Sequence, residues 1–405
     1  MQAKIKTVAF QGLDVREVDV QVMMASGLPA FNIVGLADKS VAESKERVRA
    51  ALTSLGIGLP PKRITVNLAP ADLPKEGAHY DLPIALGILA AMGVLPSDAL
   101  EEYYVLGELS LDGSCNPVSG ILPAAVAAVG EERNIICPEA SGPEAAWAGE
   151  LTVLAPANLL ALINHFKGTQ VLSRPVAKLL GASTDLADLS DIKGQESARR
   201  ALEIAAAGGH NLLMTGPPGA GKTMLAKRLS TILPPLNLYE ALETTKIHSV
   251  AGKLSAADAL MTVRPYRSPH HTISDVALVG GGMNPAPGEI SLAHRGVLFL
   301  DELPEFKRTV LEVMRQPLED REVTTSRAKF TVTYPSSFML VASMNPSPGG
   351  YFNDPDAPVT SSPAEMQRYL SKISGPLLDR IDIHIEVTPV PFEKLSEERK
   401  AETSV

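Results

Sequence analysis

The spacing of apolar residues divides the chain into two blocks with different patterns. In the first block, short apolar runs predict β-strands at 64–68, 103–106 and 134–137. Residues 38–55 instead carry charges between apolar positions that recur at helical intervals, and Gly56 follows as a stop signal. The first block is therefore predicted to mix strands and helices.

The second block begins near Ile192 and alternates strand-like runs with helical segments. Its strand-like runs are 211–215, 297–300 and 338–343. Such alternation indicates an α/β unit built on a parallel sheet. Residues 168–190, which contain glycines, a proline and an acidic polar stretch, are predicted to link the two blocks.

Composition changes this picture in two respects. With 405 residues, of which 45% are hydrophobic, the chain can form two or three domains of roughly 100–200 residues each. A net charge of −9 argues against a protein that coats nucleic acid with a broad basic surface, although a narrow pore needs only a few local cations. The two cysteines are too few for a disulfide framework and lack metal-ligand spacing.

No targeting or membrane segment is evident. The N-terminus has no apolar run typical of a signal peptide. The most apolar stretch, 82–95, contains glycines and a proline and falls short of the about 18 apolar residues that span a bilayer. We therefore expect a cytoplasmic protein that does not insert into membranes.

A glycine-rich stretch follows the first strand of the second block. Residues 212–223 read LLMTGPPGAGKT, an apolar strand that leads through a tight turn into a helix. In such a loop, glycines let backbone N–H groups converge on phosphates, a lysine reaches the β- and γ-phosphates, and a threonine hydroxyl ligates Mg²⁺. ATP and Mg²⁺ are thus the expected cofactors, and the predicted nucleotide-binding residues are Gly216, Pro217, Pro218, Gly219, Ala220, Gly221, Lys222 and Thr223.

A second signal is the apolar run 297–300, which ends in Asp301 and Glu302. Taken alone, such a run is usually a strand that enters a loop. Downstream of a phosphate-binding loop, it delivers one carboxylate to Mg²⁺ and a second that can orient or deprotonate a water. We therefore predict that Thr223 and Asp301 ligate Mg²⁺, and that Glu302 is the catalytic base.

Two more polar residues follow in the order that an ATPase would need. Asn345 lies just beyond the apolar run 338–343, where its amide could position the water or sense the γ-phosphate. Arg380 lies in GPLLDRID and could reach the γ-phosphate of a neighbouring subunit as an arginine finger. Lys222, Asn345 and Arg380 therefore join Glu302 as predicted catalytic residues.

These segments resemble a known family. GPPGAGKT, VLFLDELPEF, ASMNP and SGPLLDRIDIHIEV, with the N-terminal GLPAFNIVGLADKSVAESKERVRAAL, are similar to the magnesium chelatase-like AAA+ proteins of the YifB/ComM family. The resemblance covers essentially the whole chain. It implies an AAA+ ATPase core with a parallel sheet over 191–390 and a homo-hexameric ring. It also implies action on DNA as a helicase or branch-migration motor, in recombination during natural transformation.

Two departures from the family follow. The resemblance implies a helical lid beyond the core, but the sequence ends soon after EKLSEERKAE, so we expect 391–405 to be the start of a truncated lid. Family members often carry a cysteine cluster near the segment NPxPxGY and again further along. The corresponding stretches here, 345–351 and 359–363, hold no cysteine, so no zinc is expected.

Parts of the first block resemble the proteolytic domain of Lon. Segments 73–77 and 107–120 carry the likeness, which implies a Lon-like (ribosomal S5 domain 2-like) α/β domain over 1–167. Lon uses a serine activated by a lysine, where this sequence has His79 and Leu122. Because that mechanism needs a hydroxyl and an amine, peptidase activity is not expected. We interpret the block as a scaffold that assembles the ring or contacts DNA.

Side chains near His79 also invite a different interpretation. His79, Tyr80 and Asp81 are adjacent and could form a catalytic trio, but a packing or capping cluster is the simpler explanation. Similarly, His270 and His271 are metal-ligand types without further ligands nearby.

Two basic segments of the second block are candidates for contact with single-stranded or branched DNA. One is the loop-like stretch 264–272, and the other is a predicted hairpin at 321–334 with Arg327 and Lys329 near its tip. A few cations per subunit could grip a strand, although such segments can equally be packing hairpins with solvated charges. A rival function is a magnesium chelatase-type subunit that drives metal insertion into a porphyrin. The Lon-type first block favours the DNA motor.

Overall fold

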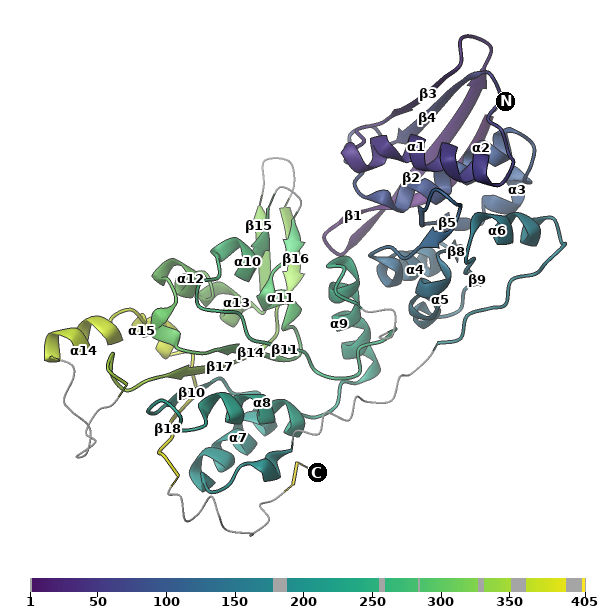
Figure 1. Cartoon of the computed structure of the whole chain (residues 1–405). Coiled ribbons are helices and arrows are strands. Elements are labelled where there is room, and N and C mark those ends of the chain that lie inside the picture. Colours follow the sequence, from purple (N-terminus) through teal and green to yellow (C-terminus); the bar gives the residue numbers. More distant parts are fainter. Residues whose placement is uncertain are drawn as a thin grey trace. The chain divides into compact units, whose positions relative to one another are not determined.

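The computed structural model describes residues 2–177, 188–254, 259–282, 285–326, 331–350, 362–390 and 403–404. The chain forms two compact units, each with its own sheet and its own buried apolar clusters (Figure 1). Unit 1 comprises Met1–Gly181 and His248–Leu260, and unit 2 comprises Ala182–Ile247 and Met261–Val405. A short stretch from inside the second block therefore packs in unit 1.

Unit 1 is built on a mixed seven-stranded sheet. Its strands, in sheet order, are β3 (Ala30–Val34), β4 (Arg63–Ala69), β2 (Asp14–Ala25), β1 (Gln2–Gln11), β5 (Tyr103–Val105), β8 (Asn134–Ile136) and β9 (Val153–Leu154). β1 and β2 form a long antiparallel hairpin, and β2 pairs antiparallel with β4. The other neighbours are parallel.

The β1–β2 hairpin shows why this sequence forms a sheet with one covered face. In β2, Val18, Val20, Val22 and Met24 are buried, and the residues between them are more exposed. This period of two places every second side chain on one face of the sheet. The buried face packs against α2 (Asp81–Ala91), which contacts both β1 and β2.

Helix α2 is apolar on all sides because it lies in the centre of unit 1. Nearly all of its residues are buried, and it is covered in turn by α1 (Lys39–Ser54) (Figure 1). The side chain of Asp38 caps α1 by accepting a hydrogen bond of 2.7 Å from the Val41 N–H. The remaining elements of unit 1 are α3 (Ser97–Leu100), β6 (Glu108–Leu109), β7 (Cys115–Asn116), α4 (Ile121–Gly130), α5 (Gly142–Ala145) and α6 (Leu159–Phe166).

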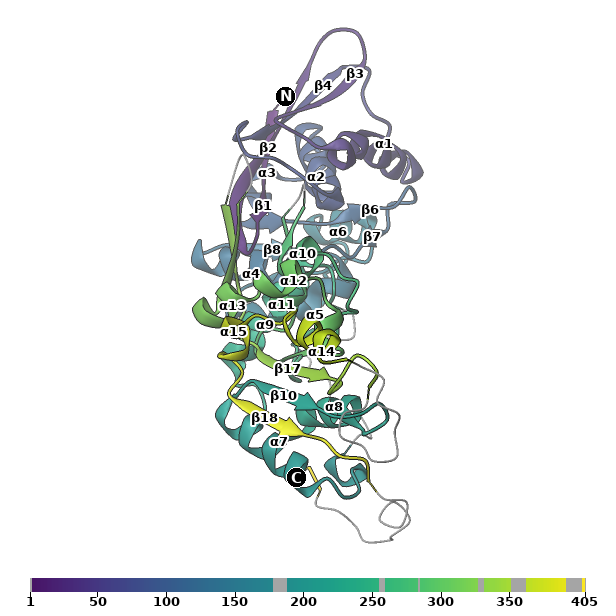
Figure 2. The same ribbon diagram turned by 90° about the vertical axis from the view of Figure 1, so that its left-hand side faces the viewer.

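Unit 2 is built on a five-stranded sheet in which all neighbours are parallel. Its strands, in sheet order, are β11 (Tyr266–Arg267), β14 (Val297–Leu300), β17 (Met339–Met344), β10 (Leu212–Thr215) and β18 (Ile383–Glu386). Figure 2 shows β17, β10 and β18 side by side. The strand that leads into the glycine-rich loop thus lies between two other strands.

Both faces of this sheet are buried. Leu298 and Leu300 of β14 point into one apolar cluster, and Val297 and Phe299 point into another. The second cluster is formed with α7 (Glu196–Gly208) and α8 (Lys222–Ile232). Covered faces explain why the strands of the second block are continuous apolar runs rather than alternating ones.

The first of these clusters is formed with shorter elements that include α10 (Asp275–Val279), α11 (Glu289–Leu292), α12 (Arg308–Glu312), α13 (Arg315–Asp320) and α15 (Gly375–Leu378). Unit 2 also has α14 (Pro363–Leu370) and the ribbons β12 (Gly280–Gly281) with β13 (Ala286–Pro287) and β15 (Glu322–Ser326) with β16 (Thr331–Pro335). Helix α9 (Leu238–Val250) begins in unit 2 and ends in unit 1. Across the described ranges, no helix combines the length and apolar composition that a membrane crossing requires.

The structure confirms the mixed α/β class with a parallel sheet, and it confirms the six predicted strands to within about a residue at each end. It differs at 264–272, which was predicted as loop, because Tyr266–Arg267 forms edge strand β11. A strand of two residues is too short to produce an apolar pattern. The predicted hairpin at 321–334 is confirmed as β15 and β16, but Arg327 and Lys329 at its tip lie outside the described residues, as do 351–361 and 391–402.

Candidate active site

The glycine-rich loop joins β10 to α8 at the carboxyl edge of the parallel sheet. The Gly216 N–H donates to the carbonyl of Met344, at the end of β17, across 3.2 Å. A Cβ at Gly216 would lie 2.2 Å from the Val387 carbonyl oxygen, so only glycine fits between the strand and the chain that follows β18. Gly221 caps α8 with a φ of +93°, which a residue with a side chain adopts only under strain.

Lys222 is the first residue of α8, and its side chain is almost fully buried. Its Nζ donates to the carbonyls of Gly216 at 2.7 Å and Pro217 at 2.9 Å, and to Asn345 Oδ1 at 3.2 Å. Burial lowers the pKa of Lys222, and the nearby carboxylates Asp301 and Glu302 act in the opposite direction. The ammonium therefore bridges the loop and the end of β17.

Asp301 lies just beyond β14, opposite the start of α8. Its Oδ2 accepts a hydrogen bond of 2.9 Å from the Thr223 hydroxyl. Its Oδ1 accepts hydrogen bonds from the Ser343 hydroxyl and, at 3.1 Å, from the Glu302 N–H. The structure thus brings the two predicted Mg²⁺ ligands, Thr223 and Asp301, into direct contact.

Ser343 was not among the predicted site residues. It is fully buried in β17, which is otherwise apolar apart from this hydroxyl. A polar residue inside a buried strand needs a partner, and here the partner is Asp301. The sequence signal that could have identified it is this single hydroxyl within the run MLVASM, two residues before Asn345.

Glu302 has a strained backbone and an exposed side chain. Its φ is +54°, a conformation uncommon for residues other than glycine. Its Oε2 lies 3.7 Å from Nδ1 of His271, whose ring packs edge-on against Phe306. The strain directs the carboxylate away from the buried strand and into the solvent-accessible side of the site.

Arg380 is not part of the cluster around Lys222. Its guanidinium forms an ion pair with Glu319 and donates to the Pro376 carbonyl. Its own carbonyl accepts a hydrogen bond of 2.8 Å from the Asn211 side chain, at the start of β10. The structure therefore brings the P-loop, Asp301 and Asn345 together, and it leaves Arg380 bound to its own subunit.

The donor set fits a nucleotide with Mg²⁺. Thr223 and Asp301 supply hard oxygen ligands at one point, and Mg²⁺ is typically held by one or two carboxylates together with substrate phosphates. Within the described ranges, no group of three or more His, Cys, Asp or Glu side chains could hold a metal by itself, and His270 and His271 are no exception. The phosphates of the nucleotide would thus be needed to complete a metal site.

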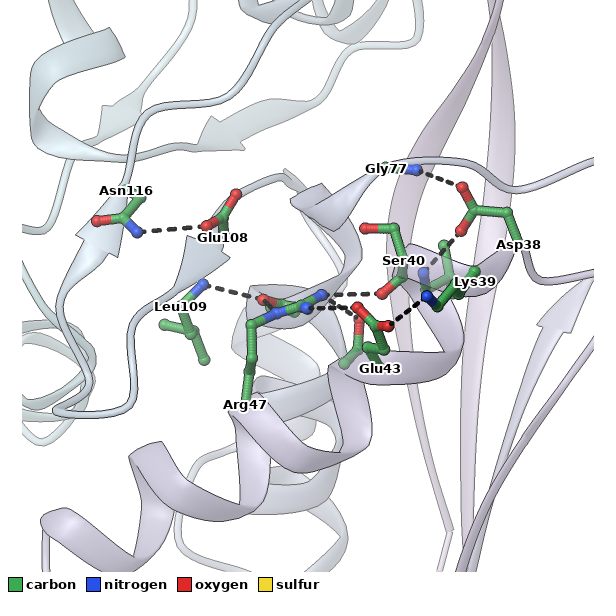
Figure 3. A network of polar contacts seen from close by, with 12 residues as sticks. Asp38, Lys39, Ser40, Glu43, Arg47, Gly77, Glu108, Leu109 and Asn116 are labelled. Atoms are coloured by element: carbon green, nitrogen blue, oxygen red, sulfur yellow. Dashed lines mark hydrogen bonds and ion pairs between the residues drawn. The ribbon is translucent and has the colours of Figure 1, made fainter. Parts of the chain in front are cut away.

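The adjacent residues His79, Tyr80 and Asp81 of unit 1 do not form a catalytic trio. His79 Nε2 lies 2.9 Å from the Val8 carbonyl, and burial lowers the pKa of His79 to about 4. Asp81 instead accepts two hydrogen bonds from Arg47 and one from the Leu109 N–H. Figure 3 shows this network, in which Arg47 also reaches the Ser40 carbonyl and Asp38 accepts from the Gly77 N–H.

The basic stretch 264–272 is also engaged within the chain. Arg267 forms a bidentate pair with Glu289, at 2.6 and 2.7 Å. Arg264 donates to the carbonyls of Pro234 and Arg295. These contacts support the packing interpretation for Arg267.

Comparisons with known proteins agree with this site. The family model described as "Magnesium chelatase, subunit ChlI" matches residues 188–395, and the one described as "Subunit ChlI of Mg-chelatase" matches residues 20–141. Lon protease 2 of Bacillus subtilis is 32% identical over 151 residues, which cover 35% of this chain and 27% of that protein.

Two relatives are similar over almost the whole chain. YifB of Salmonella typhimurium is 46% identical over 389 residues, which cover 96% of this chain and 76% of that protein. Competence protein ComM of Haemophilus influenzae is 46% identical over 391 residues, which cover 95% of this chain and 76% of that protein. The chain therefore belongs to the YifB/ComM family of magnesium chelatase-like AAA+ ATPases.

Proposed function

We propose that this chain hydrolyses ATP as a subunit of a hexameric ring and uses the energy to move or remodel DNA. The observation that carries the proposal is the contact between Thr223 and Asp301 beside Lys222 and Asn345, at the carboxyl edge of a parallel sheet. Ligand sites of α/β proteins are typically found at this edge. Helicase or branch-migration activity in recombination is the specific form that we propose.

We assign the binding of the phosphates to the loop 216–223. The N-terminus of α8 directs backbone N–H groups and a positive dipole end toward an anion. Lys222 now donates to the loop's own carbonyls, so its Nζ would exchange those contacts for the β- and γ-phosphate oxygens. Thr223 and Asp301 would hold Mg²⁺, which when bound would neutralise part of the phosphate charge.

We assign the catalytic base to Glu302 and the positioning of the attacking water to Asn345. The exposed carboxylate of Glu302 follows directly on the proposed metal ligand, and its neighbour His271 is in reach at 3.7 Å. Asn345 already contacts Lys222, so its amide lies where the γ-phosphate would be read. Arg380 would act on the nucleotide of a neighbouring subunit, after it leaves Glu319.

We further propose that the chain is organised as a Lon-like domain over 1–167, a linker over 168–190, an AAA+ core over 191–390 and the beginning of a lid over 391–405. In this arrangement the Lon-like domain is a scaffold. The neutral ring of His79 is bound to a backbone carbonyl, and Leu122 is buried and supplies only its N–H, to Glu144. Neither residue provides the hydroxyl or the amine of a Lon-type peptidase.

The experiment that tests the DNA assignment is ATP turnover with and without four-way junction DNA. We expect the junction to bind and to raise turnover several-fold in the wild-type chain. Lys222→Ala should abolish turnover in both conditions, because the phosphates lose their cation. If junction DNA neither binds nor changes turnover, and the junction is not resolved into its arms, the DNA motor is wrong. Porphyrin-dependent turnover in the presence of partner subunits would instead support the chelatase.

A further inference from the structure

A cavity of about 200 Å³ opens in unit 2 at the end of the sheet opposite to the proposed ATP site. Its lining includes Gly209, Gly296 and Phe338, which precede β10, β14 and β17 respectively. The P-loop follows β10, so the cavity and the loop are separated by the length of a four-residue strand, roughly 13 Å. The cavity is therefore not part of the nucleotide site.

Three arginines from different segments line this cavity: Arg264, Arg295 and Arg321. Arg264 is the most engaged, since it donates to two carbonyls and pairs with Glu240 at 3.3 Å. Arg295 pairs with Glu243 at 3.0 Å, and its second partner, Glu240, is 3.8 Å away. Arg295 and Arg321 therefore retain N–H donors that can face a ligand.

Arg321 is the least engaged of the three. It is exposed, and Nη1 donates to the Phe338 carbonyl across 3.4 Å, at the long limit of a hydrogen bond. Among the described residues, this is its only side-chain hydrogen bond. A guanidinium has five N–H donors in a planar fork, so most of its capacity remains.

The charges around the cavity do not cancel. Arg264, Arg295 and Arg321 face two carboxylates, Glu240 and Glu243, which leaves one positive charge. His294 does not add to it. Its Nδ1 accepts from the Ser337 N–H and its Nε2 lies 2.9 Å from Glu243, while burial lowers the pKa of the ring. A net positive cavity in a chain of net charge −9 is a local exception.

The backbone at two of these arginines is strained. Arg295 and Arg321 both have a φ of +60°, in the left-handed region that residues with side chains rarely occupy. Both are held by the short connection between β16 and β17: the Arg295 N–H donates to Ser337 O, and the Ser336 N–H donates to Arg321 O. Strain of this kind persists where the surrounding structure enforces it, and such residues cluster at ligand sites.

We propose that this cavity binds a phosphate group of the DNA backbone. The planar fork of arginine matches phosphate oxygens, and the cavity volume admits one such group. Arg321 immediately precedes β15, and Ser336 immediately follows β16, so the cavity lies at the base of the β15–β16 hairpin. The inference rests on the proposed function, and it names a contact for the DNA that the ring would hold.

Arg321→Gln is the most informative variant, because Arg321 has no ion pair to lose among the described residues. Binding of a fluorescent four-way junction is measured by anisotropy at several salt concentrations. We expect affinity to fall by about tenfold, as for the loss of one charge-assisted hydrogen bond. The slope of log affinity against log salt should flatten by about 0.7 to 0.9 for each phosphate that the variant no longer neutralises.

The matched control is Arg200→Gln, an exposed arginine of α7 that pairs with Glu203 and should leave affinity and slope unchanged. Basal ATP turnover and the thermal midpoint should be those of the wild type in both variants. If Arg321→Gln binds the junction like the control while the wild type binds it, this inference is overturned and the DNA motor survives. If the wild type itself does not bind, the proposed function fails first.

A second arm separates DNA phosphate from free phosphate. The thermal midpoint is measured in inorganic phosphate and in chloride at equal ionic strength. We expect no specific stabilisation, because a single free phosphate lacks the further contacts of a DNA strand. Stabilisation by phosphate that disappears in Arg321→Gln, with DNA affinity unchanged, would show a free-anion site and would contradict the proposal.

Discussion

Asp301 is the residue around which the proposed ATP site is ordered. Its carboxylate accepts hydrogen bonds from the Thr223 and Ser343 hydroxyls and from the Glu302 N–H. These donors fix the orientation of both oxygens before any ligand arrives. The buried hydroxyl of Ser343 therefore acts as a positioning group, because leaving it without a partner would cost roughly 1–3 kcal/mol.

The first prediction concerns Ser343→Ala. Loss of the hydroxyl should let the Asp301 carboxylate rotate, so we expect ATP turnover to fall by about tenfold, the equivalent of about 1.4 kcal/mol. The Mg²⁺ concentration for half-maximal turnover should rise, while ATP affinity changes little. Ser371→Ala, on an exposed hydroxyl, is the control. An unchanged dependence on Mg²⁺ would show that Ser343 only fills space.

The second prediction concerns His79 and pH. Burial lowers the pKa of His79 from 6.5 to about 4, so the unfolded state binds more protons than the folded state between these values. The contribution of His79 to the free energy of unfolding should be complete above pH 6.5 and be lost as the pH falls toward 4. It amounts to at most about 3 kcal/mol. Urea unfolding at a series of pH values measures it, and His79→Gln should flatten the profile. A variant with the wild-type slope in this window would refute the assignment.

At the scale of elements, the P-loop is fixed by the strands on either side of β10. Gly216 bonds to the end of β17 and lies against the chain beyond β18, at Val387. The loop thus takes its shape from three strands that are far apart in the sequence. Its conformation is therefore part of the sheet and does not depend on the loop residues alone.

The third prediction follows from that packing. Gly216→Ala would place a Cβ 2.2 Å from the Val387 carbonyl oxygen, and a backbone atom cannot move aside cheaply. We expect the free energy of unfolding to fall by about 1–3 kcal/mol and nucleotide binding to be lost. Gly130→Ala, at the end of α4 in open space, should be neutral or slightly stabilising. Equal behaviour of the two variants in urea unfolding would contradict the account.

Sequence patterns predicted the elements better than their partners. Continuous apolar runs located β10, β14 and β17 because both faces of that sheet are buried. Edge strand β11 was missed because two residues carry no period. The ion pairs of Arg267 and Arg380 and the hydroxyl of Ser343 could not be predicted, since they join residues distant in sequence. For the same reason, a contiguous division of the chain does not include His248–Leu260 in unit 1.

At the scale of the whole molecule, the proposed site is incomplete within one chain. Lys222, Asp301 and Asn345 converge, but Arg380 is paired with Glu319 of the same subunit. A ring would supply the missing cation from a neighbour. The net charge of −9 is compatible with such a motor, because DNA contact would rest on a few cations such as those of the amino-end cavity.

The fourth prediction tests the shared site. Lys222→Ala and Arg380→Ala should each be inactive alone, the first in its own phosphate contact and the second toward its neighbour. When the two are mixed, some interfaces pair an intact P-loop with an intact Arg380, so we expect part of the ATP turnover to return. The measurement is turnover against mixing ratio. Mixtures that stay inactive at every ratio would show that Arg380 does not act between subunits.

The central claim, hydrolysis of ATP at this site, is tested most directly by Glu302→Gln. We expect this variant to bind Mg²⁺ and ATP with wild-type affinity, because the P-loop, Thr223 and Asp301 are untouched. Turnover should fall by about a hundredfold or more, as for loss of a general base. The two quantities are measured on the same preparation, by equilibrium binding of a fluorescent ATP analogue and by phosphate release. Turnover within a few-fold of the wild type would contradict the claim that Glu302 is the base of an ATPase.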